Sequence, residues 1–463
     1  MNRACLTKNK SLREQNQHAS SIRPIKNNFV RMKSGLLYIM IVLSLNSGAQ
    51  VPVTLTSAID SALKNNFDIR IARVNSTISK VSNTYGMAGG LPSLNGSASD
   101  NKSLINLKQK TSSGLDITKN GVNSSSLNAG LTANMVLFNG FKVIATKGRL
   151  NLLQRQGELL LNQQIQNTIA AIMVTYYDIL RQQSYLMIIQ SSLDVSQKKL
   201  DIIKERSNVG MANEADLLQA QMDVNENAQN LKSQQLVIDQ DKTNLQQLMG
   251  AKQFIPIIVH DTIIVDEDIR RDSIINYLEN NQQYLSAEQQ IKINEQIVKE
   301  IRSQRYPSIR LNAGYNFTDN SSSAGFILFT QNYGPTAGAT LQIPIFNGTI
   351  YRTQQEVARY NVENAKLQKE SLLLALKTDA IKTYQAYEIS NQQMKSQKIS
   401  YEDASKLVKI VIQRFRVNQA TILDVKAAQA SFESAGYMFV NMQYAAKSAE
   451  IELKRLIYRL GTE

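Results

Sequence analysis

Four charged residues stand at matching places in two parts of the chain. Arg206 and Arg414 precede two short turns, and Asp216 and Asp424 follow them, with 208 residues between the members of each pair. A basic side chain suits the last turn of a helix and an acidic one suits the first turn, because both favour the helix dipole. Helix capping is therefore one interpretation of these residues. For the arginines, the other interpretation is that they hold the turns closed or contact a partner protein there.

Catalysis finds little support among the remaining reactive residues. After residue 49 the chain has one histidine, His260, which is followed by Asp261 and is interpreted as half of a surface pair. No HExxH, GxSxG, Walker or CxxC pattern occurs, and the single cysteine is Cys5. The sequence therefore predicts a protein that is not an enzyme and that has no metal or cofactor site.

The N-terminal segment has the pattern of a secretory signal. Met32-Lys33 precedes an apolar run over residues 35–45, and Ser47-Gly48-Ala49 follows it. The run is shorter than the roughly 20 residues that span a bilayer, so residues 1–49 are predicted to be an extension and signal peptide cleaved after Ala49. They carry eight Lys/Arg and one Asp/Glu, which is half of the formal charge of +14. The other basic residues are scattered along helical patterns, so nucleic-acid binding is not predicted.

Two stretches alternate apolar and polar residues and end in the same turn. They cover residues 127–140 and 335–348, and a period of two is typical of a two-faced strand. Each is predicted to pair with a strand that starts after Pro92 or Pro307, giving hairpins over 91–138 and 307–346. In the first hairpin, residues 99–126 are expected to be a polar loop. The turns that end the two stretches consist of Phe138, Asn139 and Gly140, and of Phe346, Asn347 and Gly348.

A helical pattern follows each hairpin. After residue 141, apolar residues recur every seventh position and predict a helix of about 65 residues, about 100 Å long. That ladder consists of Ile165, Ile172, Ile179, Leu186, Leu193 and Leu200. The helix is predicted to end at a tip over 207–213, where Gly210 after Val209 suits a C-cap, and to return over 214–250. An extended connector over 251–271 follows.

The second half of the chain repeats the first. It is predicted to contain a helix over 272–305, a long helix over 349–414, a tip over 415–420 with Val417 and Asn418, and a return helix over 421–460. Residues 50–270 and 271–463 are thus two repeats, the first opening with a helix over 54–85. The matches at an offset of 208 include Gly140 with Gly348 and Val209 with Val417, and those at an offset of 215 include Asn66 with Asn281 and Pro92 with Pro307.

The lengths of these elements restrict their arrangement. Each long helix must be matched along its length by returning helices. In the second repeat the return helix covers only part of the long helix, and only the helix over 54–85 can cover the rest. The two ends of the chain after the signal are therefore expected midway along the rod, beside the connector. Four strands cannot close a barrel, and two-faced strands are stable in lipid only when closed, so closure requires several chains. Two chains would give eight strands and a filled barrel, and three would give twelve and an open lumen.

The chain contains a duplicated pattern of hairpin, Phe-Asn-Gly turn and long helical pair, and the two tips read RSNVGMANEADLLQAQ and RFRVNQATILDVKAAQ. This pattern resembles the outer membrane efflux protein family of TolC-like channel-tunnels. The resemblance implies a mainly α fold with a small β part: long antiparallel coiled-coil helices forming a tube, and four strands contributed to a twelve-stranded barrel. It implies a homotrimer in the outer membrane of a Gram-negative-type bacterium. It also implies docking of the periplasmic extension on a membrane-fusion adaptor and an inner-membrane pump of RND or ABC type.

The predicted function is a passive duct of a tripartite efflux or type I secretion system. The alternative is a periplasmic coiled-coil scaffold or adaptor without a pore, which leaves the strands unused. By the resemblance, Asp424 lines the periplasmic aperture as an acidic ring, although Ala427 occupies the place of a second acidic residue. A polar latch found in some members cannot be transferred, because Phe415 and Ala420 stand at its positions. The loop over 326–329 either plugs the mouth or packs on it.

Overall fold

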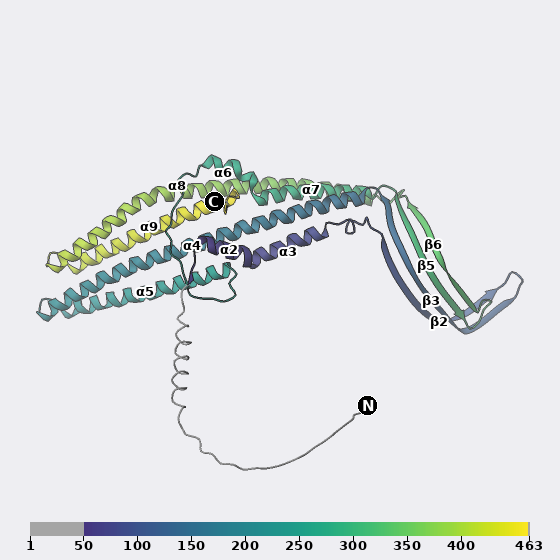
Figure 1. Ribbon diagram of the computed structural model, residues 1–463, viewed down its shortest axis with the longest axis horizontal. Helices are drawn as coiled ribbons and strands as arrows, with labels where there is room; N and C mark the ends of the chain where they lie inside the picture. Colours follow the sequence, from purple (N-terminus) through teal and green to yellow (C-terminus); the bar gives the residue numbers. More distant parts are fainter. Residues whose placement is uncertain (1–50, 462–463) are drawn as a thin grey trace, which may run out of the picture. The chain divides into compact units, whose positions relative to one another are not determined.

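The computed structural model describes residues 51–461, so the predicted extension and signal peptide lie outside the described residues. Contacts divide the chain into two units, Met1–Val51 and Pro52–Glu463. The second unit consists of long helices that run side by side and a four-stranded sheet at one end of them (Figure 1). The predicted mainly α fold with a small β part and an internal duplication is confirmed.

Two helices of 67 residues run the full length of the helical part. They are α4 (Lys142–Asn208) and α8 (Ile350–Arg416), and each turns at a tip into a return helix of 35 residues, α5 (Glu214–Leu248) or α9 (Ile422–Leu456). The return helices end midway along their partners (Figure 1). In the heptad ladder of α4, Ile172 and Ile179 are fully buried but Leu186 is only half-buried. A straight helix drifts by about 20° per heptad, so a strict seven-residue stripe does not stay on one face.

The other halves of α4 and α8 are covered by shorter helices, which are interrupted where single helices were predicted. The stretch 54–85 forms α2 (Leu55–Asn65) and α3 (Phe67–Ser82), and 272–305 forms α6 (Arg271–Tyr277), a 3₁₀ turn η2 (Leu278–Asn280) and α7 (Gln282–Ser303). The breaks fall at Asn66 and Asn281, which are related by the repeat. Each side chain caps the helix that follows and donates a hydrogen bond to the end of a return helix, Asn66 to the Leu248 carbonyl at 2.8 Å and Asn281 to the Leu456 carbonyl at 2.9 Å.

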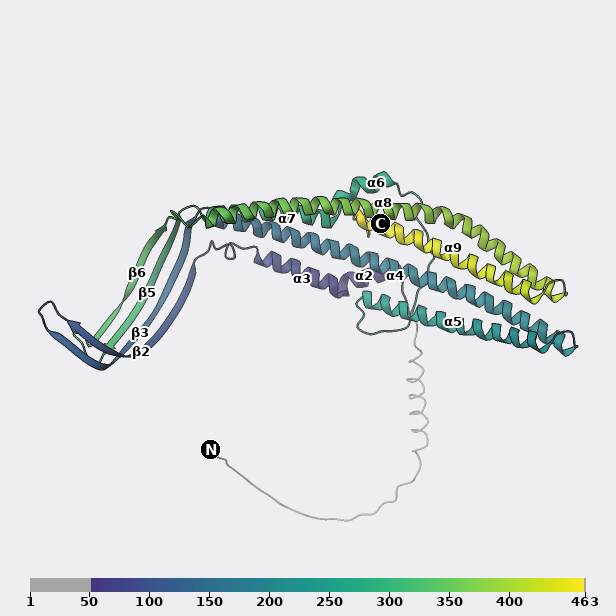
Figure 2. The ribbon, with the colours of Figure 1, turned by 180° about the vertical axis from the view of Figure 1, so that it is seen from behind.

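The four long strands form one antiparallel sheet in the order β2-β3-β5-β6. They are β2 (Ser93–Lys110), β3 (Asp116–Asn139), β5 (Ser308–Ser322) and β6 (Phe329–Gln342). The predicted polar loop over 99–126 is wrong, because strands extend through it to a turn over 111–115. The β2–β3 hairpin therefore projects past β5 and β6 (Figure 2). The strand predicted up to residue 346 stops at Gln342, two residues before Pro344, which has no backbone N–H to donate.

The two ends of the described chain meet near the middle of the helices, as predicted. After β1 (Val51–Pro52), the Val53 amide donates to the Ile258 carbonyl at 2.8 Å, next to β4 (Ile257–Ile258) in the connector. Val53, Val259 and Leu460 are buried in one apolar cluster with Ile172 and Ile179 of α4. This cluster fixes both chain ends and the connector to the long helix. Within residues 51–461, no helix combines the length and the apolar character needed to cross a membrane.

Candidate functional site

The two tips are closed by the same backbone motif. At the first tip, the Met211 amide donates to the Arg206 carbonyl at 2.7 Å, and at the second the Gln419 amide donates to the Arg414 carbonyl at 2.8 Å. Each motif needs a left-handed residue, and these are Gly210 at φ +74° and Asn418 at φ +64°. Glycine and asparagine are the residues that adopt this conformation most easily. Val209 and Val417 are the exposed C-caps just before them.

The two tip carboxylates begin the return helices. Asp216 lies in the first turn of α5, where its amide donates to the Asn213 side chain at 2.7 Å. In α9 the Asp424 amide donates to the Thr421 hydroxyl at 3.2 Å, and the Thr421 amide donates back to the Asp424 carboxylate at 2.8 Å. The backbone N–H and then the hydroxyl of Thr421 lower the pKa of Asp424, which is exposed. Helix capping is thus realised at Asp424, and its carboxylate is ionised at neutral pH.

The two tip arginines differ although they match in sequence. The Arg206 guanidinium donates to the backbone carbonyl of Phe415, in the last turn of α8, and its carbon lies 4.5 Å from the centre of the Phe415 ring. Arg206 therefore caps the long helix of the other repeat and joins the two tips. Arg414 is exposed, because Ser207 stands in the first tip where the second has Phe415.

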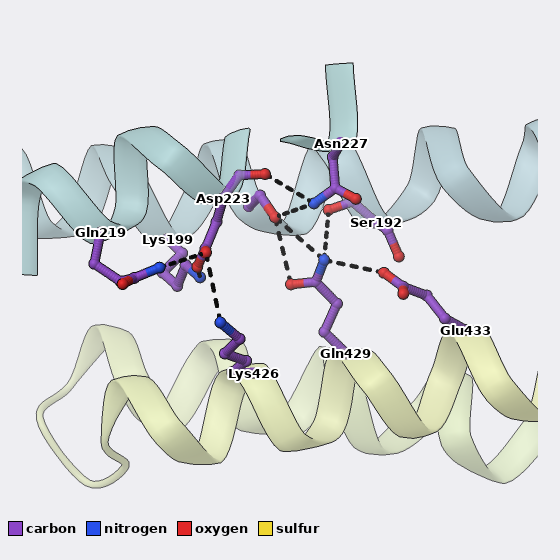
Figure 3. Close-up of polar contacts among 9 residues, drawn as sticks. Ser192, Lys199, Gln219, Asp223, Asn227, Lys426, Gln429 and Glu433 are labelled. Atoms are coloured by element: carbon purple, nitrogen blue, oxygen red, sulfur yellow. Dashed lines mark hydrogen bonds and ion pairs between the residues drawn. The ribbon is translucent and has the colours of Figure 1, made fainter. Parts of the chain in front are cut away.

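A buried ion pair lies just behind the tips, between α4 and α5. The Lys199 ammonium, in a side chain that is 1% exposed, contacts the carboxylate of Asp223, which is itself buried. Gln219 donates to the same carboxylate at 2.9 Å, and Lys426 of α9 approaches it to 3.7 Å (Figure 3). Burial raises the pKa of Asp223, but the hydrogen bonds from Lys199 and Gln219 and the two positive charges outweigh it, so the pKa is lowered.

A polar network continues this contact toward the middle of the rod. The Gln429 amide of α9 donates to the Ser196 hydroxyl of α4 at 3.2 Å, and Asn227 of α5 donates to Ser196 at 3.0 Å. Gln429 also donates to Glu433 at 3.2 Å (Figure 3). These residues join three helices from both repeats. Sequence reasoning missed them as a cluster, although Gln429 matches Gln221 in the repeat.

The strand-to-helix turns share an unusual backbone. Gly140 and Phe141 in the first turn, and Gly348 and Thr349 in the second, all have φ between +66° and +69°. A Cβ on Gly140 would collide with the Ser303 carbonyl oxygen, whereas a Cβ on Gly348 would meet no atom of residues 51–461 within 4 Å.

Side chains around the two turns differ in the same way. Phe138 stacks edge-on with Phe141 at 5.3 Å, and Asn139 accepts from the Val143 amide at 3.3 Å. At the second turn Phe346 is 83% exposed, and the side-chain nitrogen of Asn347 is buried without a hydrogen-bond partner among the described residues. The second turn therefore lacks the packing that completes the first.

The sheet has one apolar and one polar face. Paired residues on an antiparallel sheet share a face, so complete rows can be followed across the four strands. On the apolar face one such row is Ala98, Ala129, Phe317 and Tyr333, and the next toward the helices is Gly96, Leu131, Tyr315 and Pro335. On the polar face the rows contain Ser, Thr, Asn and Gly, as in Ser99, Asn128, Thr318 and Asn332.

Both outer strands of this sheet have one unpaired side. β2 and β6 stand at the ends of the strand order, so each carries a row of backbone N–H and C=O groups without a partner strand among the described residues. Pro92 and Pro307 come directly before β2 and β5, where a missing N–H disturbs no ladder bond. An edge of 18 or 14 residues is long enough to pair with another chain.

The remaining candidates lie away from the tips and the strand-to-helix turns. His260 and Asp261 are both exposed, and residues 51–461 contain no cluster of His, Cys, Asp and Glu suited to a metal ion. The loop that contains residues 326–328 packs on the projecting hairpin, where the Phe326 amide donates to Gln109 at 3.3 Å.

Known proteins share this architecture. The family model described as outer membrane efflux protein matches residues 58–251 and 274–457, well over half of the chain. No curated protein sequence matches. Three solved structures share the fold: the outer membrane protein VceC from Vibrio cholerae, the outer membrane channel CmeC from Campylobacter jejuni, and the open state of the outer membrane channel MtrE from Neisseria gonorrhoeae.

Their likeness to this chain is structural rather than close in sequence. VceC is 17% identical with a TM-score of 0.69, over 87% of this chain and 95% of VceC. CmeC is 16% identical with a TM-score of 0.73, over 88% and 85%, and MtrE is 18% identical with a TM-score of 0.62, over 87% and 88%. The family match covers both repeats and agrees with the predicted outer-membrane efflux channel. The chain belongs to the outer membrane efflux protein family.

Proposed function

We propose that three copies of this protein form a passive duct across the outer membrane, serving a tripartite efflux or type I secretion system. The duct carries small molecules or polypeptides delivered by a periplasmic membrane-fusion adaptor and an inner-membrane pump of the RND or ABC type. The observation that carries the proposal is a two-faced sheet with both edges open. Four strands with two unpaired edges close when β6 of one copy pairs with β2 of the next, and three copies give twelve strands.

The apolar face fits the thickness of a membrane. Along β5 it extends from Ile309 to Phe317, about 27 Å of strand, or about 20 Å when the strand is tilted by about 40°. The next row contains Asp100 and Asp319 and ends the apolar band. A lipid-facing band is about 25 Å tall and is flanked by aromatic residues, a place that Tyr333 and Phe317 occupy in this sheet.

The helices support closure by a second copy. α7 packs between α4 and α8, but α3, its counterpart in the first repeat, packs on α4 and leaves apolar residues exposed. These are Ile71, Val74, Ile78 and Val81, and α8 exposes Val357, Tyr360, Leu367 and Leu374. In a ring of three chains, α3 of one copy covers α8 of the next, so the helices close into a tube as the strands close into a barrel.

The tips provide the periplasmic end of the duct. Val209, Met211, Val417 and Leu423 are all more than 60% exposed there, which suits docking of an adaptor. Asp424 lies one turn behind the second tip, and three copies would place an acidic ring around the aperture. Such a ring attracts cations.

Cysteine labelling on whole cells tests this orientation. Ser113→Cys lies in the turn between β2 and β3, and Asn208→Cys lies at the first tip; both positions are exposed. A membrane-impermeant maleimide should label Ser113→Cys on intact cells and Asn208→Cys only after the outer membrane is permeabilised. Absence of labelling at Ser113→Cys until permeabilisation would instead favour a periplasmic scaffold.

A further inference from the structure

The polar face of the sheet is almost free of charge. Between the helices and the outer end of β5, this face carries mainly Ser, Thr, Asn and Gly in successive rows, and one charged residue, Arg310. The other charged residues of the same paired region are Asp100, Lys102 and Asp319, and all of them belong to the apolar face. A lone arginine among neutral side chains therefore sets the charge of this face.

Arg310 lies close to the helical end of the sheet, one row from the last pairs on this face, which Ser308 makes with Asn139 and Gln342. It pairs with Val136 on β3 and with Thr340 on β6, so it has no charged neighbour in its own row. The residue is exposed, and within residues 51–461 no acidic side chain lies at ion-pair distance from its guanidinium. An exposed arginine without a carboxylate partner is available to bind an anion.

Closure of the sheet would bring three such residues together. Twelve strands about 4.8 Å apart and tilted by about 40° enclose a barrel of about 12 Å radius. An inward-pointing arginine reaches about 6 Å from its Cα, which leaves three guanidinium groups about 10 Å apart around the axis. This is about one Debye length at 0.1 M salt, so their fields overlap in the lumen.

We infer that three copies of Arg310 form a cationic ring at the base of the barrel, which binds multivalent anions and favours the passage of anionic solutes. The inference rests on the proposed trimeric barrel. Guanidinium groups bind phosphate and carboxylate oxygens through paired hydrogen bonds, and the neutral rows above the ring offer no competing carboxylates. The ring therefore acts as a charge filter at the opposite end of the helical tube from Asp424.

Block of the pore by a polyanion tests the ring. Inositol hexakisphosphate is added to the loop side of single channels in a planar bilayer at 0.1 M salt, and its apparent Kd is measured for the wild type and for Arg310→Gln. We expect Arg310→Gln to weaken the block at least about tenfold, since three charge-assisted contacts are lost. Arg310→Lys should retain most of the block, and higher salt should weaken it in the wild type.

The matched control removes a positive charge from the other face. Lys102→Gln lies on the apolar face, where its side chain is 77% exposed, and should leave the block unchanged. A wild-type channel that conducts but is not blocked, or an Arg310→Gln channel blocked as strongly as the wild type, would overturn the ring. If the wild type forms no channel, the proposed function itself fails, and the inference fails with it.

Discussion

The acidic residues behind the two tips match in sequence, but the structure gives them different surroundings. Asp424 takes part in a reciprocal cap with Thr421, whereas Asp216 follows an Asn213 cap. Because hydrogen bonds from Thr421 lower the pKa of Asp424, its contribution to stability is complete above pH about 4 and is lost as the pH falls through the lowered pKa. At neutral pH the ionised carboxylate serves as a cap and is available for the proposed aperture ring.

Replacement of Asp424 by Ala separates these roles. We expect Asp424→Ala to weaken block of the channel by multivalent cations added from the tip side, because three converging carboxylates would be lost. The trimer should still assemble, because Asp424 is exposed and the Thr421 hydroxyl still caps the helix. Bilayer recordings with Asp216→Ala serve as the matched control. Unchanged cation block in Asp424→Ala would remove this residue from the aperture.

The buried pair of Lys199 and Asp223 gives a second prediction. Lys199→Met leaves the buried Asp223 carboxylate with only the exposed Lys426 ammonium at 3.7 Å and the Gln219 amide, and we expect a loss of about 3–5 kcal/mol in the stability of the helices. The second repeat has Leu407 and Ser431 at the matching positions. The double variant Lys199→Leu/Asp223→Ser should therefore recover most of this loss, since replacing both members of a buried pair is far less costly.

Thermal unfolding followed by circular dichroism at 222 nm measures both variants. The pKa of Asp223 is lowered in the folded protein, so its stabilising effect is present above pH about 4 and is lost at lower pH. As the pH falls below about 4, the melting temperature of the wild type should therefore fall relative to that of the double variant, which lacks this carboxylate. A double variant as unstable as Lys199→Met would show that the site requires the charges.

At the scale of the elements, the helix breaks at Asn66 and Asn281 position α3 and α7, the helices that lead toward the sheet. Asn281→Ala removes a cap from α7 and a hydrogen bond to the end of α9, so we expect a loss of about 1–3 kcal/mol. The neighbouring residue Asn280 is exposed, and Asn280→Ala should change the melting temperature little. Equal melting temperatures for the two variants would contradict the capping role of Asn281.

Sequence patterns predicted the long helices, both tips and the sheet because these elements are long or duplicated. They did not predict the helix breaks, because the apolar spacing continues through Asn66 and Asn281. The reason for each break is a hydrogen bond to the end of a return helix, which is distant in the sequence. The stretch 99–126 was misassigned because strands projecting beyond the apolar band need no apolar face. Its Ser, Asn and Lys residues have the composition of a loop.

The candidate site was predictable only in part. Gly210 and the matching residue Asn418 could be placed at the turns because left-handed positions select few residue types. The contact of Arg206 with Phe415, and that of Asp223 with Lys426, join segments about 200 residues apart, and no local pattern encodes such a pairing. The internal repeat does not predict such contacts either: Arg414 matches Arg206 in sequence, but it has no aromatic partner at the equivalent place.

At the scale of the whole molecule, substitutions in the two strand-to-helix turns test the assembly. Gly140→Ala should prevent correct folding, because the new Cβ would meet the backbone of Ser303. Within one chain Gly348→Ala should cost only the strain of a left-handed alanine, about 1–2 kcal/mol. If a neighbouring copy packs there as Ser303 packs on Gly140, Gly348→Ala should also reduce the yield of trimer on unheated gels. A normal trimer yield would show that no backbone approaches Gly348.

The assembly itself can be tested by fractionating cells that express the protein and running SDS gels of unboiled and boiled samples. The open edges of β2 and β6 and the apolar face of the sheet predict a trimer in the outer membrane fraction that dissociates to monomers on boiling. A soluble periplasmic protein that runs as a monomer or dimer without boiling would contradict the duct, and the scaffold would then be the better account of the helices.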